Sequence, residues 1–279
     1  MIFVTTGTKA IFELTGRRLI ESFLETNSEG NHLVFWFEDL EDPKRDTLPP
    51  WIPIEFFEKD NLHFVNIMTH SDLVERVDTF LEHRIEYTDE YSSPRSLKWF
   101  RPVAAIKFTT ELFPKRIFCS IDADCEFTGK IDKDVYKEIL EPYNVCYLGR
   151  KHFKIMQHGD WRNGEYVKTG EKYASDKDTH TETGFIGFNC EKEGTNEFIE
   201  KNLDYWTTGD ILDMKYKTDC HTFDATVESL SELVYNNMLE SYGTTSPIGS
   251  KVLEVSPMGK WMTHNKGTLG PQLYNRNEI

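Results

Sequence analysis

The stretch that most constrains this fold is a buried strand that ends in two closely spaced acids. Residues 117–121 are apolar apart from one serine, and Asp122 and Asp124 follow directly. Placing two carboxylates next to a buried hydrophobic strand costs free energy unless a positive charge lies close to them. Both point to the same side of an extended chain, so one divalent cation could bind them there. Open α/β sheets bind ligands outside the carboxyl ends of their strands, which is where this pair is expected to lie.

The alternative to a metal site is an acidic, solvated turn, which an acidic chain can place anywhere on its surface. The 47 acidic and 32 basic residues give a formal net charge of -15. General binders of nucleic acid or of membrane surfaces carry a basic excess, so this charge argues against both classes, although a local basic groove stays open. An acid excess fits a protein that needs metal ions to hold a polyanionic ligand.

The chain has five cysteines, an odd number without a C-x-x-C pair. This pattern argues against a zinc site or a disulfide framework. The N-terminus lacks the basic region and long apolar run of a signal peptide, and no stretch approaches the ~20 apolar residues of a membrane helix. We therefore expect a cytoplasmic protein, and its 279 residues suit one large domain or two small ones.

The N-terminal part begins like a parallel α/β sheet. Apolar residues predict a strand at 2–4, a helix at 11–24 and a second buried strand at 33–37. This order is typical of such sheets. The turn after the first strand lacks the glycine patterns of a Rossmann fingerprint or a P-loop. Its hydroxyl and backbone N–H groups could still contact a nucleotide, at Thr5, Thr6, Gly7 and Lys9.

Hydrophobic patterns predict the remaining elements. Further strands are expected at 54–57, 63–67, 145–148, 182–189 and 252–255. Further helices are expected at 71–85, 96–110, 131–142, 198–206 and, with Thr222 as its cap, 222–238. The polar segment 150–179 has little periodicity, which is often a sign of a functional region such as a lid or an acceptor-binding loop. Basic residues on the helix at 96–110, including Arg101, could reach a pyrophosphate at the acids or could form a solvated helix face.

In this order the features resemble nucleotide-sugar glycosyltransferases of the A-type fold, glycogenin-like or phage-type, over roughly residues 1–267. The matching pieces are the Thr-rich turn, the helix with Arg101, the Asp-x-Asp pair, the strand at 183–189, the acidic helix start at 219–224 and the segment 264–267. Where glycogenin-like members have asparagine and alanine before the strand's glycine, this chain has Glu182 and Thr183. Of their Asp-Gln-Asp motif only an acid is kept.

The resemblance implies an α/β fold with a single Rossmann-like mixed sheet flanked by helices. One domain would span residues 1–279, with a nucleotide-binding half at 1–125 and an acceptor-binding half at 126–279. It also implies a UDP-sugar as donor and a hydroxyl as acceptor, on a glycan, a protein side chain or a hydroxymethylated DNA base. A DNA acceptor needs a local basic groove, for which residues 150–154 and Arg162 are the candidates.

The resemblance further implies a divalent ion, Mn²⁺ or Mg²⁺, held by Asp122, Asp124 and His264. Such an ion neutralises the leaving diphosphate, and a donor set of carboxylates and imidazole favours Mn²⁺. Further contacts to the nucleotide or its phosphates are implied for Lys9, Arg101, Lys266 and Gly267.

The chemistry at the acceptor stays open between two outcomes. An inverting enzyme needs a general base on the acceptor hydroxyl, for which Glu182 and Asp224 are candidates. A retaining enzyme uses a carboxylate or amide on the other face, with Asp224 and Asn189 as candidates. Two other functions also stay open, a sugar nucleotidyltransferase on a related sheet and a non-catalytic acidic binding protein.

Overall fold

The computed structural model describes residues 1–39, 42, 47–68, 96–151, 159–162, 165–168, 179–214, 218–241 and 252–265. The helix expected at 71–85 and most of the polar segment at 150–179 lie outside these ranges. Within them, no helix is both long and apolar enough to cross a membrane.

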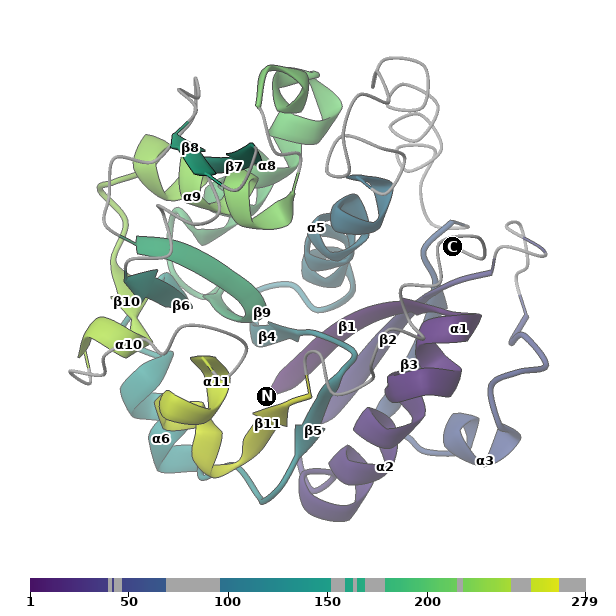
Figure 1. Ribbon diagram of the computed structural model, residues 1–279. Coiled ribbons are helices and arrows are strands. Elements are labelled where there is room, and N and C mark those ends of the chain that lie inside the picture. Colours follow the sequence, from purple (N-terminus) through teal and green to yellow (C-terminus); the bar gives the residue numbers. More distant parts are fainter. Residues whose placement is uncertain are drawn as a thin grey trace.

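A seven-stranded sheet in the order β10-β6-β9-β4-β1-β2-β3 forms the middle layer of the molecule (Figure 1). Its strands are β1 (Ile2–Thr8), β2 (His32–Glu38), β3 (Leu62–Asn66), β4 (Ile117–Ile121), β6 (Val145–Lys151), β9 (Thr179–Asn189) and β10 (Tyr235–Asn237). Strand β9 is antiparallel to both of its neighbours, and the other ladders are parallel. The carboxyl ends of β1, β2 and β4 therefore share one edge of the sheet.

Two small antiparallel sheets complete the strands. One joins β5 (Cys125–Phe127) to β11 (Met262–His264), and the other joins β7 (Gly159–Arg162) to β8 (Glu165–Lys168). The first of these brings a strand from the C-terminal part of the described chain beside the segment that follows β4.

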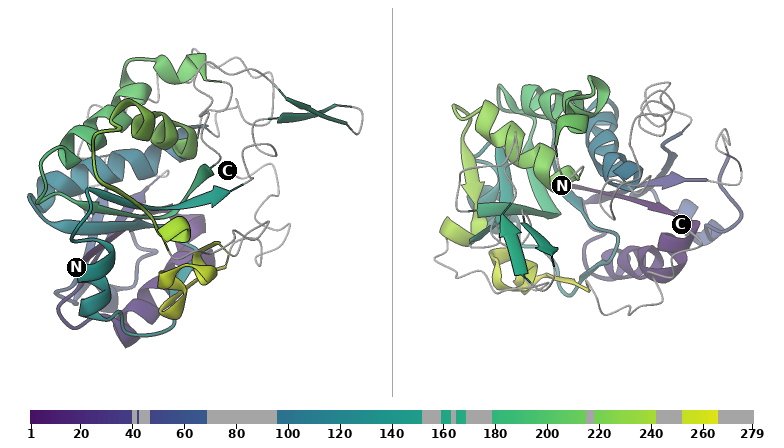
Figure 2. Two further views of the ribbon diagram at one scale, coloured as in Figure 1. Left: turned by 90° about the vertical axis from the view of Figure 1, so that its left-hand side faces the viewer. Right: turned by 45° about the horizontal axis from the view of Figure 1, so that its top comes forward.

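Helices cover both faces of the main sheet, and this arrangement confirms the expected mixed α/β fold. The longer ones are α2 (Arg17–Thr26), α5 (Ser96–Leu112), α6 (Lys133–Ile139), α8 (Thr195–Thr207) and α9 (Asp219–Ser229). The shorter ones are α1 (Lys9–Ile11), which runs through a π-helical turn (Phe12–Gly16) into α2, α3 (Ile54–Phe57), α10 (Met238–Ser241), α11 (Val252–Val255) and the 3-10 turns Asp210–Asp213 and Pro257–Lys260. Figures 1 and 2 show α5, α8 and α9 on one face and α2, α6 and α11 on the other.

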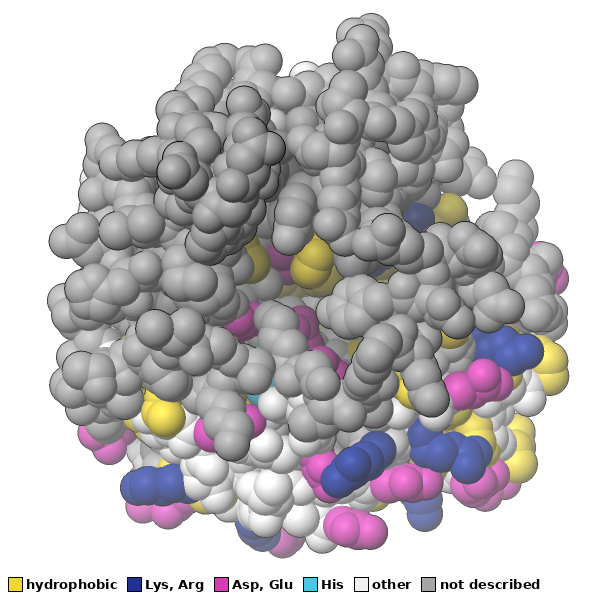
Figure 3. Space-filling view, viewed as in Figure 1, with side chains coloured by type: hydrophobic (Ala, Val, Ile, Leu, Met, Phe, Trp, Pro, Cys, Tyr) yellow, Lys and Arg dark blue, Asp and Glu magenta, His cyan; other side chains and the backbone are white. Residues whose placement is uncertain are grey.

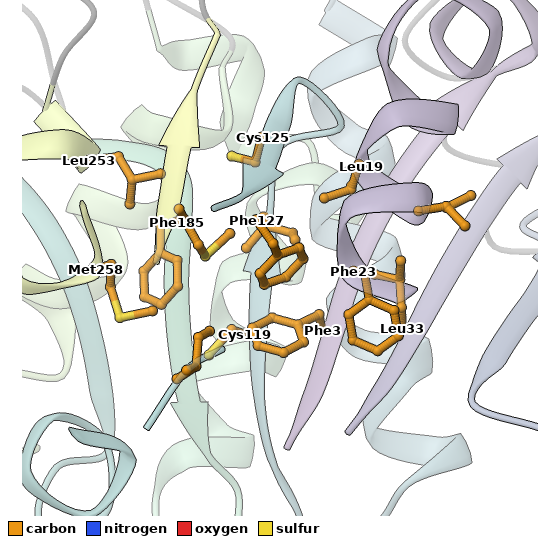
Figure 4. Close-up of a cluster of buried hydrophobic side chains, with 14 of the residues drawn as sticks. Phe3, Leu19, Phe23, Leu33, Cys119, Cys125, Phe127, Phe185, Leu253 and Met258 are labelled. Carbon is orange, nitrogen blue, oxygen red and sulfur yellow. The ribbon is translucent and has the colours of Figure 1, made fainter. Parts of the chain in front are cut away.

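The core on the α2 face fixes the segment that follows β4. Figure 4 shows Phe3 of β1, Phe23 of α2 and Phe127 of β5 packed together. The ring centroids of Phe3 and Phe127 are 4.9 Å apart, and those of Phe23 and Phe127 are 5.7 Å apart. The Ser22 hydroxyl accepts a hydrogen bond from Phe127 N–H at 3.0 Å. Contacts with β1 and with α2 therefore fix strand β5, and with it the position of the turn that precedes it.

Two predicted strands are helical turns in the structure. Residues 54–57 form α3, in which Phe56 is buried while Ile54 and Phe57 are 65% and 54% exposed. Residues 252–255 form α11, in which Val252 and Leu253 are buried. Apolar runs of four residues fit a strand and a single helical turn equally well, so the hydrophobic pattern alone could not separate them.

The helix predicted at 222–238 is also wrong in its extent. It begins at Asp219, three residues before the expected cap, and it ends at Ser229. Strand β10 follows and pairs with β6 at the edge of the sheet. Asn144 anchors this edge, since its side chain accepts from Val234 N–H at 3.1 Å and its own N–H donates to Val234 O at 2.7 Å. Tertiary pairing thus overrides an apolar spacing that continues past the end of the helix.

Candidate metal centre

The acidic pair lies in a tight turn at the carboxyl end of β4. Cys125 N–H donates to Asp122 O at 3.0 Å, so this segment is a turn rather than the extended chain expected from the sequence. Strand β5 follows at once and pairs with β11 in a register that places His264 opposite Cys125. His264 Nε2 lies 2.9 Å from Asp124 Oδ1 and 3.4 Å from Asp122 Oδ2. The structure therefore brings together the three residues expected to hold a metal.

The environment of His264 fits a cation. Its side chain is only 1% exposed. Burial lowers the pKa of His264, but the carboxylates of Asp122 and Asp124 outweigh this effect and raise the pKa to about 9. Even so, Nε2 makes no hydrogen bond of good geometry with any described residue. A buried imidazole nitrogen that faces two carboxylates in this way fits a divalent ion, and the mixed nitrogen and oxygen donors suit Mn²⁺.

Two further buried groups adjoin the imidazole. The potential ligand atoms of Glu182, Asp122 and His264 all lie within 4.8 Å of one another, and those of Asp124, Cys125 and His264 form a second such cluster. Burial and the neighbouring carboxylates raise the pKa of Cys125 well above its usual range. In the metal-free protein the group is therefore a thiol, and it donates to the Gly184 carbonyl oxygen at 3.7 Å. Carboxylates and imidazole are the better donor set.

Glu254 of α11 positions the backbone of His264. Its Oε1 accepts hydrogen bonds from His264 N–H and from the Thr263 hydroxyl, each at 2.9 Å. Asn265 N–H donates to Asp124 O at 3.0 Å, which ties β11 to the acidic turn itself. Glu254 could not be recognised as part of the site from the sequence, because the apolar residues around it predict a strand at 252–255 instead of the helical turn α11. The available signal was a single acid inside an otherwise apolar run.

Gly184 on β9 leaves room for this centre. A Cβ built on it would lie 2.7 Å from His264 Cε1 and 3.1 Å from Asp122 Oδ2. Its carbonyl accepts a hydrogen bond from Asp122 N–H at 3.1 Å. A glycine inside a strand often marks a close approach of other groups to the backbone, and here the approaching groups are two of the candidate ligands.

The two acids are partly exposed, with 38% of the Asp122 side chain and 26% of the Asp124 side chain accessible to solvent. Figure 3 shows acidic side chains gathered near the middle of this face, with a histidine visible beside them. On the opposite side of β4 and β9 lies a small cavity of about 10 Å³, lined in part by Ser120, Thr183, Asn202 and Asp219. That volume is room for about one water molecule, so this cavity is too small to hold a sugar.

The Thr-rich end of β1 lies at the same edge of the sheet as the acidic pair, because β1 and β4 are parallel. Thr5 is buried, and its hydroxyl has no hydrogen-bond partner among the described residues. Thr6 is half-buried, and Lys9 is exposed in α1. Gly7 admits the side chain of Ile11, since a Cβ on Gly7 would lie 2.9 Å from Ile11 Cγ2. Strand β1 continues to Thr8, so Thr5, Thr6 and Gly7 belong to the strand and not to the turn expected after residue 4. Within this end of β1, the buried Thr5 hydroxyl is a group with unmet hydrogen-bonding capacity.

Arg101 forms an ion pair at this edge. Its Nη2 lies 2.7 Å from Glu38 Oε1 at the end of β2, and the two side chains are 8% and 16% exposed. Removing one partner of a buried pair is costly, because the other charge stays buried. The guanidinium therefore supports the fold, in addition to any contact that it makes with a phosphate.

Arg101→Ala is expected to lower the free energy of unfolding by about 3 kcal/mol, measured by urea unfolding without any nucleotide. Lys107→Ala is the matched control on the same helix, since Lys107 pairs with the more exposed Glu200 and Glu111. Pairs of that kind contribute at most about 1 kcal/mol. Equal losses in the two variants would contradict a structural role for the Arg101 pair.

Asn189 does not meet the acidic pair. It is in register with Ile117, the first residue of β4, whereas the acids follow Ile121, the last. Four residues of strand separate these points by roughly 13 Å. The Asn189 side chain donates to Glu141 O at 2.9 Å and accepts from Glu191 N–H at 3.1 Å. These contacts describe an amide that closes the turn after β9.

Asp224 contacts β9 from the neighbouring helix α9. Asp224 is on α9, where it is buried and accepts a hydrogen bond from Thr181 N–H of β9 at 3.2 Å. It is thus attached to the same strand as Glu182 but from the α9 face. Lys266 and Gly267 lie outside the described residues.

No protein-family model matches this chain, and no curated protein matches it in sequence. Among solved structures, the apo form of the bifunctional glycosyltransferase WbbM matches with a TM-score of 0.50 and 14% identity, over 86% of this chain and 39% of its own. Mouse xyloside xylosyltransferase 1, also apo, matches with a TM-score of 0.47 and 14% identity, over 85% of this chain and 84% of its own. Core-mannan synthase A from Aspergillus fumigatus, in its Mn/GDP form, matches with a TM-score of 0.47 and 8% identity, over 85% of this chain and 70% of its own.

The likeness to WbbM concerns the fold, since the identity is only 14% and this chain spans 39% of that one. It agrees with the mixed sheet and with the expected A-type glycosyltransferase fold. What such a fold does depends on the groups that it brings to its site.

Proposed function

We propose that this chain is a metal-dependent glycosyltransferase, which moves a sugar from a nucleotide diphosphate sugar to an acceptor hydroxyl, with a UDP-sugar as the first donor to test. The observation that carries the proposal is the convergence of Asp122, Asp124 and His264 at the carboxyl end of β4. Ligands of open α/β sheets bind at this edge. The fold shared with WbbM, a glycosyltransferase, supports the same class.

In this proposal Asp122, Asp124 and His264 hold Mn²⁺, or less favourably Mg²⁺. When bound, the ion neutralises the charge that develops on the leaving diphosphate. The hydroxyl and backbone groups at the end of β1 lie at the same edge and suit a nucleotide. The proposed nucleotide contacts are Thr5, Thr6, Gly7, Lys9, Arg101, Lys266 and Gly267.

On the acceptor side we assign the chemistry to Asp224. In an inverting enzyme it would act as general base on the acceptor hydroxyl, and in a retaining enzyme it would be the carboxylate on the other face of the sugar. The anomeric configuration of the product, read by NMR, separates the two. Asn189, the other candidate for the retaining role, is held at the opposite end of β9.

Thermal unfolding of the wild type with UDP, with Mn²⁺ and with both tests the proposal. We expect UDP at 100 times its dissociation constant to raise the unfolding temperature by about 5 °C when Mn²⁺ is present and to leave it unchanged without Mn²⁺. UDP should then be released slowly from a UDP-sugar by hydrolysis, and faster by sugar transfer when the right acceptor among glycans, proteins and hydroxymethylated DNA is present. No shift with UDP, GDP or ADP in the presence of Mn²⁺ would contradict the proposal and favour a binding protein. Synthesis of a UDP-sugar from UTP and a sugar phosphate would point to a nucleotidyltransferase.

A further inference from the structure

Strand β9 is irregular beside the metal centre. Its pairing with β6 passes from Tyr147 opposite Ile186 to Leu148 opposite Glu182, so one step on β6 corresponds to four residues on β9. A regular antiparallel ladder would advance by one residue on each strand. Residues 183–185 are therefore extra on the β6 side, and bulges of this kind re-aim the side chains around them.

The bulge changes which face of the sheet Glu182 meets. Thr183 and Ile186 both line the small cavity on the α5 and α9 side, although they are three residues apart. Side chains of a regular strand return to one face only at every second residue. Because Thr183 takes that face, its neighbour Glu182 is directed to the other side, where Asp122 and His264 lie. The strand is thus shaped so that a third carboxylate reaches the centre.

Burial makes this placement informative. Glu182 is 2% exposed, and its carboxylate shares a cluster of 4.8 Å with Asp122 and His264. Buried carboxylates that adjoin one another are costly unless a cation compensates them. The Nε2 atom of His264 is buried and faces the same space, and it makes no hydrogen bond of good geometry with a described residue although it lies 2.9 Å from Asp124 Oδ1. The Glu182 carboxylate and the His264 imidazole therefore face one space, and the carboxylate and imidazole atoms around it suit a divalent ion.

We propose that Glu182 is itself a ligand of the metal, together with Asp122, Asp124 and His264, instead of the general base considered from the sequence. The inference rests on the proposed metal-dependent function. Three carboxylates around a divalent ion and a neutral imidazole leave a net charge of -1 (three negative, two positive). Such a centre binds the ion without help from a diphosphate. The metal is therefore a resident of the protein, and it does not need to arrive with the nucleotide.

Titration of the protein with Mn²⁺ in the absence of nucleotide tests this, with free Mn²⁺ followed by EPR. Glu182→Gln should weaken binding at least tenfold, because it removes one anionic ligand, and Glu182→Asp should weaken it less. Glu126→Gln is the matched control. Glu126 lies on β5 but its carboxylate pairs with the exposed Arg18 at 2.6 Å and with Asn265 at 3.3 Å; because such surface pairs contribute at most about 1 kcal/mol, Mn²⁺ affinity should stay within about twofold.

The unfolding temperature measured in EDTA shows whether Glu182 is a metal ligand or a residue that only stabilises the fold. Glu182→Gln should be at least as stable as the wild type without metal, since it removes a negative charge from a crowded acidic site. Equal Mn²⁺ affinity in Glu182→Gln and wild type, with the joint response to UDP and Mn²⁺ intact, would overturn this inference and leave the proposed function standing. Loss of Mn²⁺ binding in Glu182→Gln, in a protein that responds to no nucleotide, would uphold the ligand and reject the function.

Discussion

Asp124→Asn is expected to abolish the joint response to UDP and Mn²⁺ and to lower sugar transfer by about 10³-fold. The change keeps the shape of the side chain and removes the charge 2.9 Å from His264 Nε2. A catalytic metal ion contributes several kcal/mol of charge stabilisation, and about 4 kcal/mol corresponds to this factor in rate. The measurements are thermal unfolding with both ligands and UDP release from a UDP-sugar.

Asp134→Asn provides the matched control for this variant. Asp134 lies on α6 with its side chain 87% exposed, so it loses the same charge far from any buried partner. In EDTA, Asp124→Asn should unfold at a lower temperature than Asp134→Asn, because it removes one of the two carboxylates that face the buried His264 imidazole. If Asp124→Asn kept full Mn²⁺-dependent stabilisation by UDP, the acidic pair would be a solvated turn and the proposed function would fail.

Gly184→Ala is expected to weaken Mn²⁺ binding at least tenfold and to lower transfer accordingly. The added methyl would lie 2.7 Å from His264 Cε1, closer than carbon atoms approach in folded proteins. The imidazole or the Asp122 carboxylate must therefore move, and misplacement of a reacting group by about 1 Å can cost 10²-fold in rate. Mn²⁺ titration by EPR measures the effect on the centre directly, apart from any effect on the acceptor.

Two other glycines separate a clash at the centre from a clash elsewhere. A Cβ on Gly187, on the same strand, would lie 2.2 Å from Leu140 Cδ2, so Gly187→Ala should cost about 1–3 kcal/mol of stability and keep Mn²⁺ affinity. Gly129→Ala meets only ordinary contacts, at 3.7 Å from Trp261 Cδ1, and should change neither quantity. An equal loss of Mn²⁺ affinity in Gly184→Ala and Gly187→Ala would show that any disturbance of β9 suffices.

Much of the sheet could be predicted from the sequence. The strands at 2–4, 33–37 and 117–121 are buried runs of mostly apolar residues, and all are strands of the main sheet. Such runs carry their own signal, because they are hydrophobic over a length that suits a strand. The runs at 54–57 and 252–255 were wrongly predicted to be strands. They have only four residues each, which is too short to distinguish the helical period of 3.6 from the strand period of two.

The parts of the centre that escaped prediction depend on register. Asp122 and Asp124 stand out in the sequence, and the resemblance supplied His264. Glu182 was considered, but as a base, because regular alternation gives no reason to turn it toward the histidine. That reason is the bulge at 183–185, which exists only once β6 and β4 have paired with β9. The bulge depends on how three strands pair with one another, so it cannot be recognised in the sequence of β9 alone.

The pairing of β5 with β11 also sets the order in which the centre can form. His264 lies 140 residues after Asp124 (264 minus 124), and it reaches the acids only when β11 has docked beside β5. Contacts across such a distance in sequence form late, because a long loop must close first. A chain still being synthesised could therefore fold its N-terminal strands and α2 but could not yet bind the ion. Metal binding at the proposed centre would then report that β11 has paired with β5.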